Sequence, residues 1–92
     1  MPAINDLYQT ILDRKNNPRE GSYTTSLFTK GLPRMAQKVG EEGVEVAVAA
    51  LSQTDELLVG EIADLTYHVL VIMVARGIHP DDIARELEKR RH

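Results

Sequence analysis

Apolar residues recur along most of this chain at the three- and four-residue spacing that is typical of amphipathic helices. A first helix is predicted over residues 2–15, with five apolar residues on one face: Ile4, Leu7, Tyr8, Ile11 and Leu12. Pro2 suits the first turn of this helix. Residues 13–22 then form a polar loop that contains proline and glycine.

Capping residues and glycines divide the rest of the chain into further helices. Ser22 can cap a short helix over residues 23–30, and Gly31 ends it. A longer amphipathic helix follows from residue 32 to about residue 51. These signals are local, and they predict two consecutive helices.

The second half of the chain shows the same kind of signals. Thr54 caps a helix that has acidic residues in its first turn and continues to residue 76, where Gly77 ends it. A last helix begins at Pro80 and finishes among the basic residues 89–91, which suit a helix C-terminus. Because no strand-like alternation is present, we predict an all-α fold.

The polar break around Gln53 turns the chain back on itself, so the helices that flank it should form an antiparallel hairpin. Glu45 and Glu61 each lie about eight residues from Gln53, which is roughly 12 Å of helix. Glu42 and Asp64 each lie about eleven residues away, or roughly 16 Å. The hairpin is therefore expected to set Glu45 opposite Glu61 and Glu42 opposite Asp64.

These four acids share the helical phase of the apolar residues around them. Carboxylates that face one another in a partly buried seam repel, and a divalent cation removes the conflict. Ligation by oxygen alone suits Mg²⁺, with Mn²⁺ as the other candidate. The ordinary alternative for a Glu-x-x-Glu pattern is a solvated acidic surface, and the residues by themselves leave both interpretations open.

The length of 92 residues predicts one small domain over residues 1–92. Such a short chain buries a limited core, and association with a second copy adds buried area. The run from 69 to 75 is apolar all round, which favours a homodimer. Four residues of this run are expected to lie partly in the interface: Leu70, Val71, Ile72 and Val74.

Composition excludes several classes of function. The formal net charge of −3 argues against broad nucleic-acid binding, and the absence of cysteine excludes disulfides and thiolate chemistry. No basic and apolar signal segment opens the sequence, and the longest apolar run is too short to span a bilayer. We therefore expect a cytoplasmic protein with neither nucleic acid nor membrane as partner.

Other polar residues are candidates for ligand contacts. Arg14, Lys15 and Arg19 in the first loop could reach a phosphate, although charged loops are usually just solvated. His68 shares a helix face with Asp64 and could be a ligand or a base. A packed, hydrogen-bonded core histidine is the favoured interpretation of His68.

The acid pattern resembles a known signature. Glu41-Glu42-x-x-Glu45 followed by Glu61-x-x-Asp64 is similar to that of the all-α, MazG-like nucleotide pyrophosphohydrolases. Three runs resemble, more narrowly, the phosphoribosyl-ATP pyrophosphatases of histidine biosynthesis: Ser22-Tyr23-Thr24, Lys38-Val39-Gly40-Glu41-Glu42 and Glu61-x-Ala63-Asp64-Leu65-x-Tyr67-His68. The similarity covers nearly the whole chain, with no departure at the four acid positions. Gly43, where the family more often has alanine, is a small difference.

The resemblance implies a reaction, a cofactor and an assembly. Phosphoribosyl-ATP and water would give phosphoribosyl-AMP and pyrophosphate, with Mg²⁺, in a helical homodimer. The implied metal ligands are Glu42, Glu45, Glu61 and Asp64. Glu41 would orient a ligand or a water molecule. The expected phosphate contacts are Lys38, Lys30 and Arg34, although Lys38 is equally placed for a salt bridge to Glu41 or Glu42. The candidates for the second ribose phosphate are Ser22, Tyr23, Thr24, Arg14, Lys15 and Arg19.

The expected architecture is therefore a helical hairpin core that is extended to a four-helix-type bundle and completed by homodimerisation. Two other functions remain open. A relative that acts on other nucleoside triphosphates would keep the same acids and differ in its base and ribose pocket. A non-enzymatic helical interaction module would need no metal ion.

Overall fold

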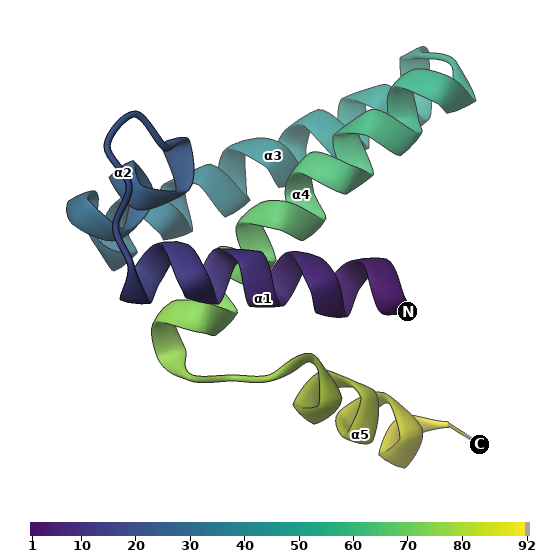
Figure 1. The fold of residues 1–92 in the computed structure, drawn as a ribbon. Helices are drawn as coiled ribbons and strands as arrows, with labels where there is room; N and C mark the ends of the chain where they lie inside the picture. Colours follow the sequence, from purple (N-terminus) through teal and green to yellow (C-terminus); the bar gives the residue numbers. More distant parts are fainter. Residues whose placement is uncertain (92) are drawn as a thin grey trace.

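The computed structural model describes residues 1–91, and this part of the chain folds into α-helices without strands (Figure 1). The predicted all-α class is confirmed. The helices follow one another in the order α1 Pro2–Asn16, α2 Tyr23–Lys30, α3 Leu32–Ser52, α4 Asp55–Arg76 and α5 Pro80–Arg90.

The helix ends are where the capping residues place them. Ser22 Oγ accepts a hydrogen bond from the backbone N–H of Thr25 at 3.2 Å, and Thr54 Oγ1 accepts one from Leu57 at 3.3 Å. Gly77 has a φ of 70°, a left-handed conformation that favours glycine and that ends α4. Because these signals are local, the bounds of the helices could be predicted from the sequence.

The two longest helices, α3 and α4, form the predicted antiparallel hairpin, which turns back at residues 53 and 54 (Figure 1). At the end far from this turn, α1 packs across α4, and α2 packs on the first half of α3 and on α1. The last helix, α5, contacts α1 and extends away from the hairpin (Figure 1). The four-helix-type arrangement with a second copy stays a prediction.

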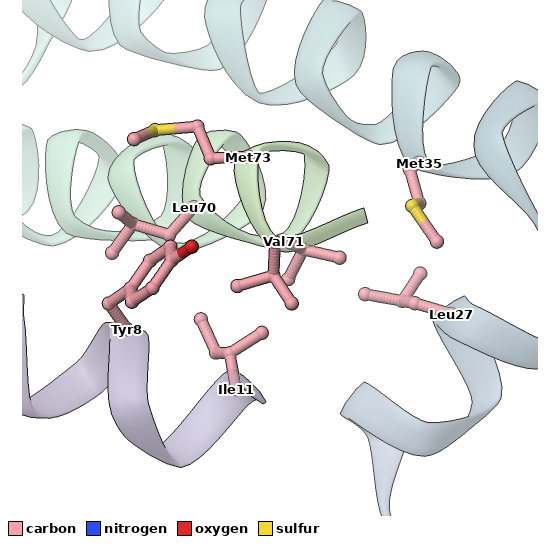
Figure 2. Close-up of a cluster of buried hydrophobic side chains, with 8 residues drawn as sticks. Tyr8, Ile11, Leu27, Met35, Leu70, Val71 and Met73 are labelled. Atoms are coloured by element: carbon pink, nitrogen blue, oxygen red, sulfur yellow. The ribbon is translucent and has the colours of Figure 1, made fainter. Parts of the chain in front are cut away.

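The hydrophobic core lies where α1, α2, α3 and the second half of α4 meet (Figure 2). Its buried side chains are Tyr8, Ile11, Leu27, Met35, Leu70, Val71, Met73 and Val74. Figure 2 shows Tyr8 and Ile11 of α1 reaching toward α4, and Leu27 of α2 lying against Met35 of α3. This core fixes the base of the hairpin and the position of the short helix α2.

The core corrects one expectation about the dimer. Leu70, Val71 and Val74 retain only 3%, 0% and 1% of their exposure, since the chain's own helices cover them. Ile72 is partly buried against the same cluster. The prediction that these residues lie partly in an interface is wrong for Leu70, Val71 and Val74. Helices α1, α2 and α3 therefore bury most of this apolar run without a second copy, and Val69 at its start stays exposed.

Helix α4 is also long and apolar enough, by length and composition, to cross a membrane. An 18-residue window within it has a mean hydropathy of 1.8. The core helix of a soluble protein passes the same test, and α4 carries Glu61 and Asp64 along its length. Only 28% of this window is buried, so the core accounts for the apolar second half of α4 and not for the exposed apolar residues of its first half.

Truncation of a core side chain in α2 should destabilise the whole hairpin base. Leu27 is 1% exposed, and Leu27→Ala should cost about 2–5 kcal/mol of unfolding free energy through lost burial and a residual cavity. Lys89→Ala is the control, because the Lys89 side chain is 78% exposed near the end of α5 and this change should alter stability by less than about 0.5 kcal/mol. Equal losses for the two variants in urea denaturation would contradict this core.

Candidate active site

Three glutamates from the two hairpin helices come together and form what we call the carboxylate cluster. Glu42 and Glu45 belong to α3 and Glu61 belongs to α4, and each offers an oxygen within 4.8 Å of the others. Glu42 is buried, Glu61 is half-buried and Glu45 is exposed. The hairpin thus brings together three of the four acids that the sequence singled out as metal ligands.

The fourth acid, Asp64, lies about one turn beyond Glu61 on α4 and is exposed. Its carboxylate is not part of the group whose oxygens lie within 4.8 Å. Its backbone carbonyl accepts a hydrogen bond from His68 Nδ1 at 2.8 Å. Three of the four acids that were expected at one level therefore come together, and Asp64 lies about one turn further along α4.

Two carboxylate oxygens in the cluster have no hydrogen-bond partner in the part of the chain that the structure describes. They are Glu42 Oε2 and Glu61 Oε2, and both are buried. A buried, unpaired carboxylate oxygen is costly, and a bound cation would satisfy it. The donor set consists only of carboxylate oxygens, which hard divalent cations such as Mg²⁺ and Mn²⁺ prefer. The residues present therefore fit such an ion.

Lys38 supplies positive charge at the edge of the cluster. Its Nζ lies 3.4 Å from Glu41 Oε1 and 3.4 Å from Glu42 Oε1. Burial lowers the pKa of Lys38, but hydrogen bonds to Glu41 and Glu42 outweigh it, so this pKa lies above its ordinary value. The structure therefore contains the salt bridges that the sequence offered as the alternative to a phosphate contact.

Glu41 lies off the cluster, as its helical phase predicts. Gln37 Nε2 donates to Glu41 Oε2 at 3.0 Å, and this bond, together with Lys38, lowers the pKa of Glu41. The charge of Arg34 acts in the same direction. Lys30 is exposed at the end of α2. The cations Lys38 and Arg34 thus lie on the α3 side of the site, around Glu41.

The two motifs that narrowed the family resemblance meet in space. The hydroxyl of Tyr23 on α2 lies 3.1 Å from His68 Nε2 on α4, and the hydroxyls of Thr24 and Tyr67 are hydrogen-bonded. His68 is 6% exposed, so it is a packed, hydrogen-bonded histidine, as the favoured interpretation held. Burial raises the pKa of Tyr67, against the effect of its bond to Thr24. This pairing could not be predicted from local sequence patterns, because the partners are more than forty residues apart.

The remaining predicted contacts lie around the loop that joins α1 to α2. Ser22 uses its oxygen to cap α2, and Arg14 pairs with Asp13 at 2.8 Å. Lys15 and Arg19 are exposed. The expectation that Arg14 and Lys15 lie in the loop is wrong, because α1 continues to Asn16 and holds both in its last turn; Arg19 lies in the loop itself.

Comparisons with known proteins agree with these features. A family model described as phosphoribosyl-ATP pyrophosphohydrolase matches residues 4–91. A phosphoribosyl-ATP pyrophosphatase of Clostridium botulinum is 54% identical over 97% of this chain and 81% of its own length. Proteins of the same name from Saccharolobus solfataricus and Lacticaseibacillus casei are 50% and 56% identical over 96% of this chain, and over 94% and 80% of their own lengths.

The family match covers all five helices, and thus the carboxylate cluster together with the paired Tyr23–His68 and Thr24–Tyr67 contacts. The relatives are similar to this chain over nearly its whole length. The resemblance drawn from its acids and from its Ser-Tyr-Thr and Tyr-His runs is therefore confirmed, and the chain belongs to the phosphoribosyl-ATP pyrophosphohydrolase family.

Proposed function

We propose that this chain hydrolyses phosphoribosyl-ATP to phosphoribosyl-AMP and pyrophosphate, the second step of histidine biosynthesis, with a divalent cation held between α3 and α4. The main support for a bound cation is the carboxylate cluster, in which two buried oxygens have no hydrogen-bond partner within residues 1–91. Family membership and the names of the relatives support the substrate. We propose that the chain does this as one domain, in the cytoplasm and without a membrane or nucleic acid.

The proposed ligands are Glu42, Glu45 and Glu61, with Asp64 beside them as the fourth. When bound, Mg²⁺ or Mn²⁺ would polarise phosphate oxygens and make a water molecule easier to deprotonate. Glu42 and Glu61 would contribute the buried oxygens that no described residue satisfies. Helices α3 and α4 would hold these ligands in place, since the core at the base of the hairpin fixes both.

Positive charge is needed where pyrophosphate leaves, and α3 supplies it. Lys38 contacts Glu42 of the cluster, Arg34 acts on the neighbouring Glu41, and Lys30 lies at the end of the preceding helix. Lys38 would exchange its bonds with Glu41 and Glu42 for bonds with a phosphate. Gln37 Nε2 donates to Glu41 Oε2, and this bond would hold the Glu41 carboxylate in place to orient a water molecule.

The far end of the substrate would be held at the first loop. Arg14 and Lys15 in the last turn of α1 and Arg19 in the loop would supply charge there, and the Arg19 carbonyl accepts a hydrogen bond from the backbone N–H of Ser22. Ser22 Oγ accepts the capping bond, so its hydroxyl hydrogen remains free to donate to a phosphate oxygen. This division assigns the triphosphate to the carboxylate cluster and the second ribose phosphate to the first loop.

Substrate preference tests this function against hydrolysis of ordinary nucleoside triphosphates. Wild type should release pyrophosphate from phosphoribosyl-ATP far faster than from ATP. Ser22→Ala should lower kcat/KM for phosphoribosyl-ATP by about tenfold to a hundredfold, the loss of a charge-assisted bond, with a smaller effect on ATP. Thr54→Ala is the control, because it removes an equivalent helix cap far from the site. Equal rates on both substrates in wild type would leave only the broader pyrophosphohydrolase activity.

The ligand set is tested by isosteric amides. Near-complete loss of activity is expected for each of Glu42→Gln, Glu45→Gln, Glu61→Gln and Asp64→Asn, and little change for the control Glu56→Gln in the exposed first turn of α4. Without metal, Glu42→Gln and Glu61→Gln should melt at a higher temperature than wild type, because each removes repulsion from the cluster. Near-normal turnover in any two of the four variants would refute the proposed set of metal ligands.

The non-enzymatic alternative is tested by the thermal midpoint of unfolding of the wild type. A midpoint that does not change with Mg²⁺ would favour that alternative.

A second copy is the proposed cover for the exposed apolar side chains of the hairpin. These are Val44, Val48 and Leu51 on α3 and Leu57, Val59, Ile62 and Val69 on α4. Val69 also lines an apolar groove of 570 Å³ that α1, α4 and α5 enclose. An open groove beside such a surface supports association of two chains, since a 92-residue chain gains buried area from it.

Sedimentation should therefore find a dimer at micromolar concentration. Val59→Glu places a charge on the exposed α4 surface and should give a folded monomer, because Val59 is 66% exposed in the single chain. Ile83→Glu on α5, where Ile83 is 45% exposed and lines the groove, tests whether the groove belongs to the same interface. A monomeric wild type would contradict the proposed dimer.

A further inference from the structure

The side chains that join α2 to α4 lie just beyond the carboxylate cluster. Tyr67 and His68 follow Asp64 on α4 and lie about one helical turn further along. The Tyr67 hydroxyl is bonded to the Thr24 hydroxyl, and His68 Nε2 lies 3.1 Å from the Tyr23 hydroxyl. Both bonds therefore connect the cluster-bearing helix to the first turn of α2.

The proton positions around His68 follow from its partners. Its Nδ1 lies 2.8 Å from the backbone carbonyl of Asp64, which can only accept, so Nδ1 carries a proton. In the neutral ring Nε2 is then an acceptor, and the Tyr23 hydroxyl donates to it. The Tyr23 oxygen keeps lone pairs for another donor, and the residue remains 51% exposed. His68 thus holds the Tyr23 hydroxyl in place, while the exposed phenol ring of Tyr23 remains accessible to a ligand.

The same turn of α2 holds the end of the first loop. The backbone N–H of Arg19 donates to Thr25 Oγ1 at 3.0 Å, and the backbone N–H of Ser22 donates to the Arg19 carbonyl at 3.1 Å. The rings of Tyr23 and Tyr67 also stack, with centroids 6.3 Å apart. A continuous series of contacts therefore runs from the loop through α2 to α4 and the backbone of Asp64.

We propose that Tyr67 and His68 are positioning residues that set the separation between the carboxylate cluster and the segment Ser22–Thr24. This inference rests on the proposed function, in which the two places hold opposite ends of phosphoribosyl-ATP. A ligand held at both ends reacts only when the two contacts lie at the right separation. Because α2 packs mainly on α3 and α1, the bonds from Tyr67 and His68 are what fix its first turn to α4.

Steady-state kinetics on phosphoribosyl-ATP tests the Thr24–Tyr67 bond. Tyr67→Phe and Thr24→Val each remove one hydroxyl and should raise KM about fivefold, the loss of one neutral hydrogen bond, with kcat changed less than about twofold. The double variant should match either single one, because both remove the same bond. Thr24→Ser keeps the hydroxyl and should recover most of the loss. Tyr8→Phe is the matched control, since Tyr8 packs against His79 away from α2.

The His68 contact is tested in the same way. His68→Asn keeps an amide near the position of Nδ1 and removes the bond from Tyr23, so its effect on KM should not add to that of Tyr23→Phe. In all these variants the Mg²⁺ concentration for half-maximal rate should stay at the wild-type value, because the carboxylate cluster is untouched.

The outcomes separate the inference from the proposed function. Wild-type protein that releases no pyrophosphate from phosphoribosyl-ATP would overturn both. Active wild type with an unchanged KM in Tyr67→Phe and Thr24→Val would overturn the positioning role alone, even if the variants melt at a lower temperature. Additive effects in the double variants, or a shifted Mg²⁺ dependence, would also overturn it.

Discussion

The close approach of three carboxylates across the α3–α4 hairpin is the constraint on which the rest of the structure depends. Glu42, Glu45 and Glu61 have oxygens within 4.8 Å of one another, and two buried oxygens have no partner in the described chain. Such an arrangement is unfavourable unless the helices are held together elsewhere or a cation is shared. The apolar core at the base of the hairpin, with side chains from α1 and α2, holds the two helices together.

The arrangement divides the hairpin into parts with different tasks. The second half of α4 is buried by the chain's own helices, and its first half carries Glu61 beside exposed apolar residues. Helix α2 joins these parts, since Leu27 lies in the core while Tyr23 and Thr24 contact α4 close to Asp64. The polar contacts of α2 therefore depend on the same packing that aligns the carboxylates.

Most of the fold could be predicted from the sequence because its signals are local. Ser22, Thr54 and Gly77 act within their own turns, and the apolar spacing specifies each helix face. The acids of α3 and α4 were paired by counting from the turn, and this holds for Glu45 and Glu61. Counting could not show that Asp64 would lie outside the group, because it assumes straight helices in register and says nothing of side-chain direction.

The features that could not be predicted from the sequence are contacts between distant parts of the chain. The apolar run around Val71 suggested an interface, but its burial depends on α1 and α2, whose packing no periodicity reveals. The bonds from Tyr23 and Thr24 to α4 connect residues more than forty positions apart. The family resemblance contained both motifs and identified the family, yet it gave no indication that they touch.

The central claim is that the carboxylate cluster binds a divalent cation, and anomalous diffraction from crystals grown with Mn²⁺ tests it most directly. The account predicts a strong peak between α3 and α4, within about 2.0–2.3 Å of oxygens from Glu42, Glu45 and Glu61. At saturating Mn²⁺, a cluster without a peak, or one whose buried oxygens are instead paired with a lysine, would contradict it.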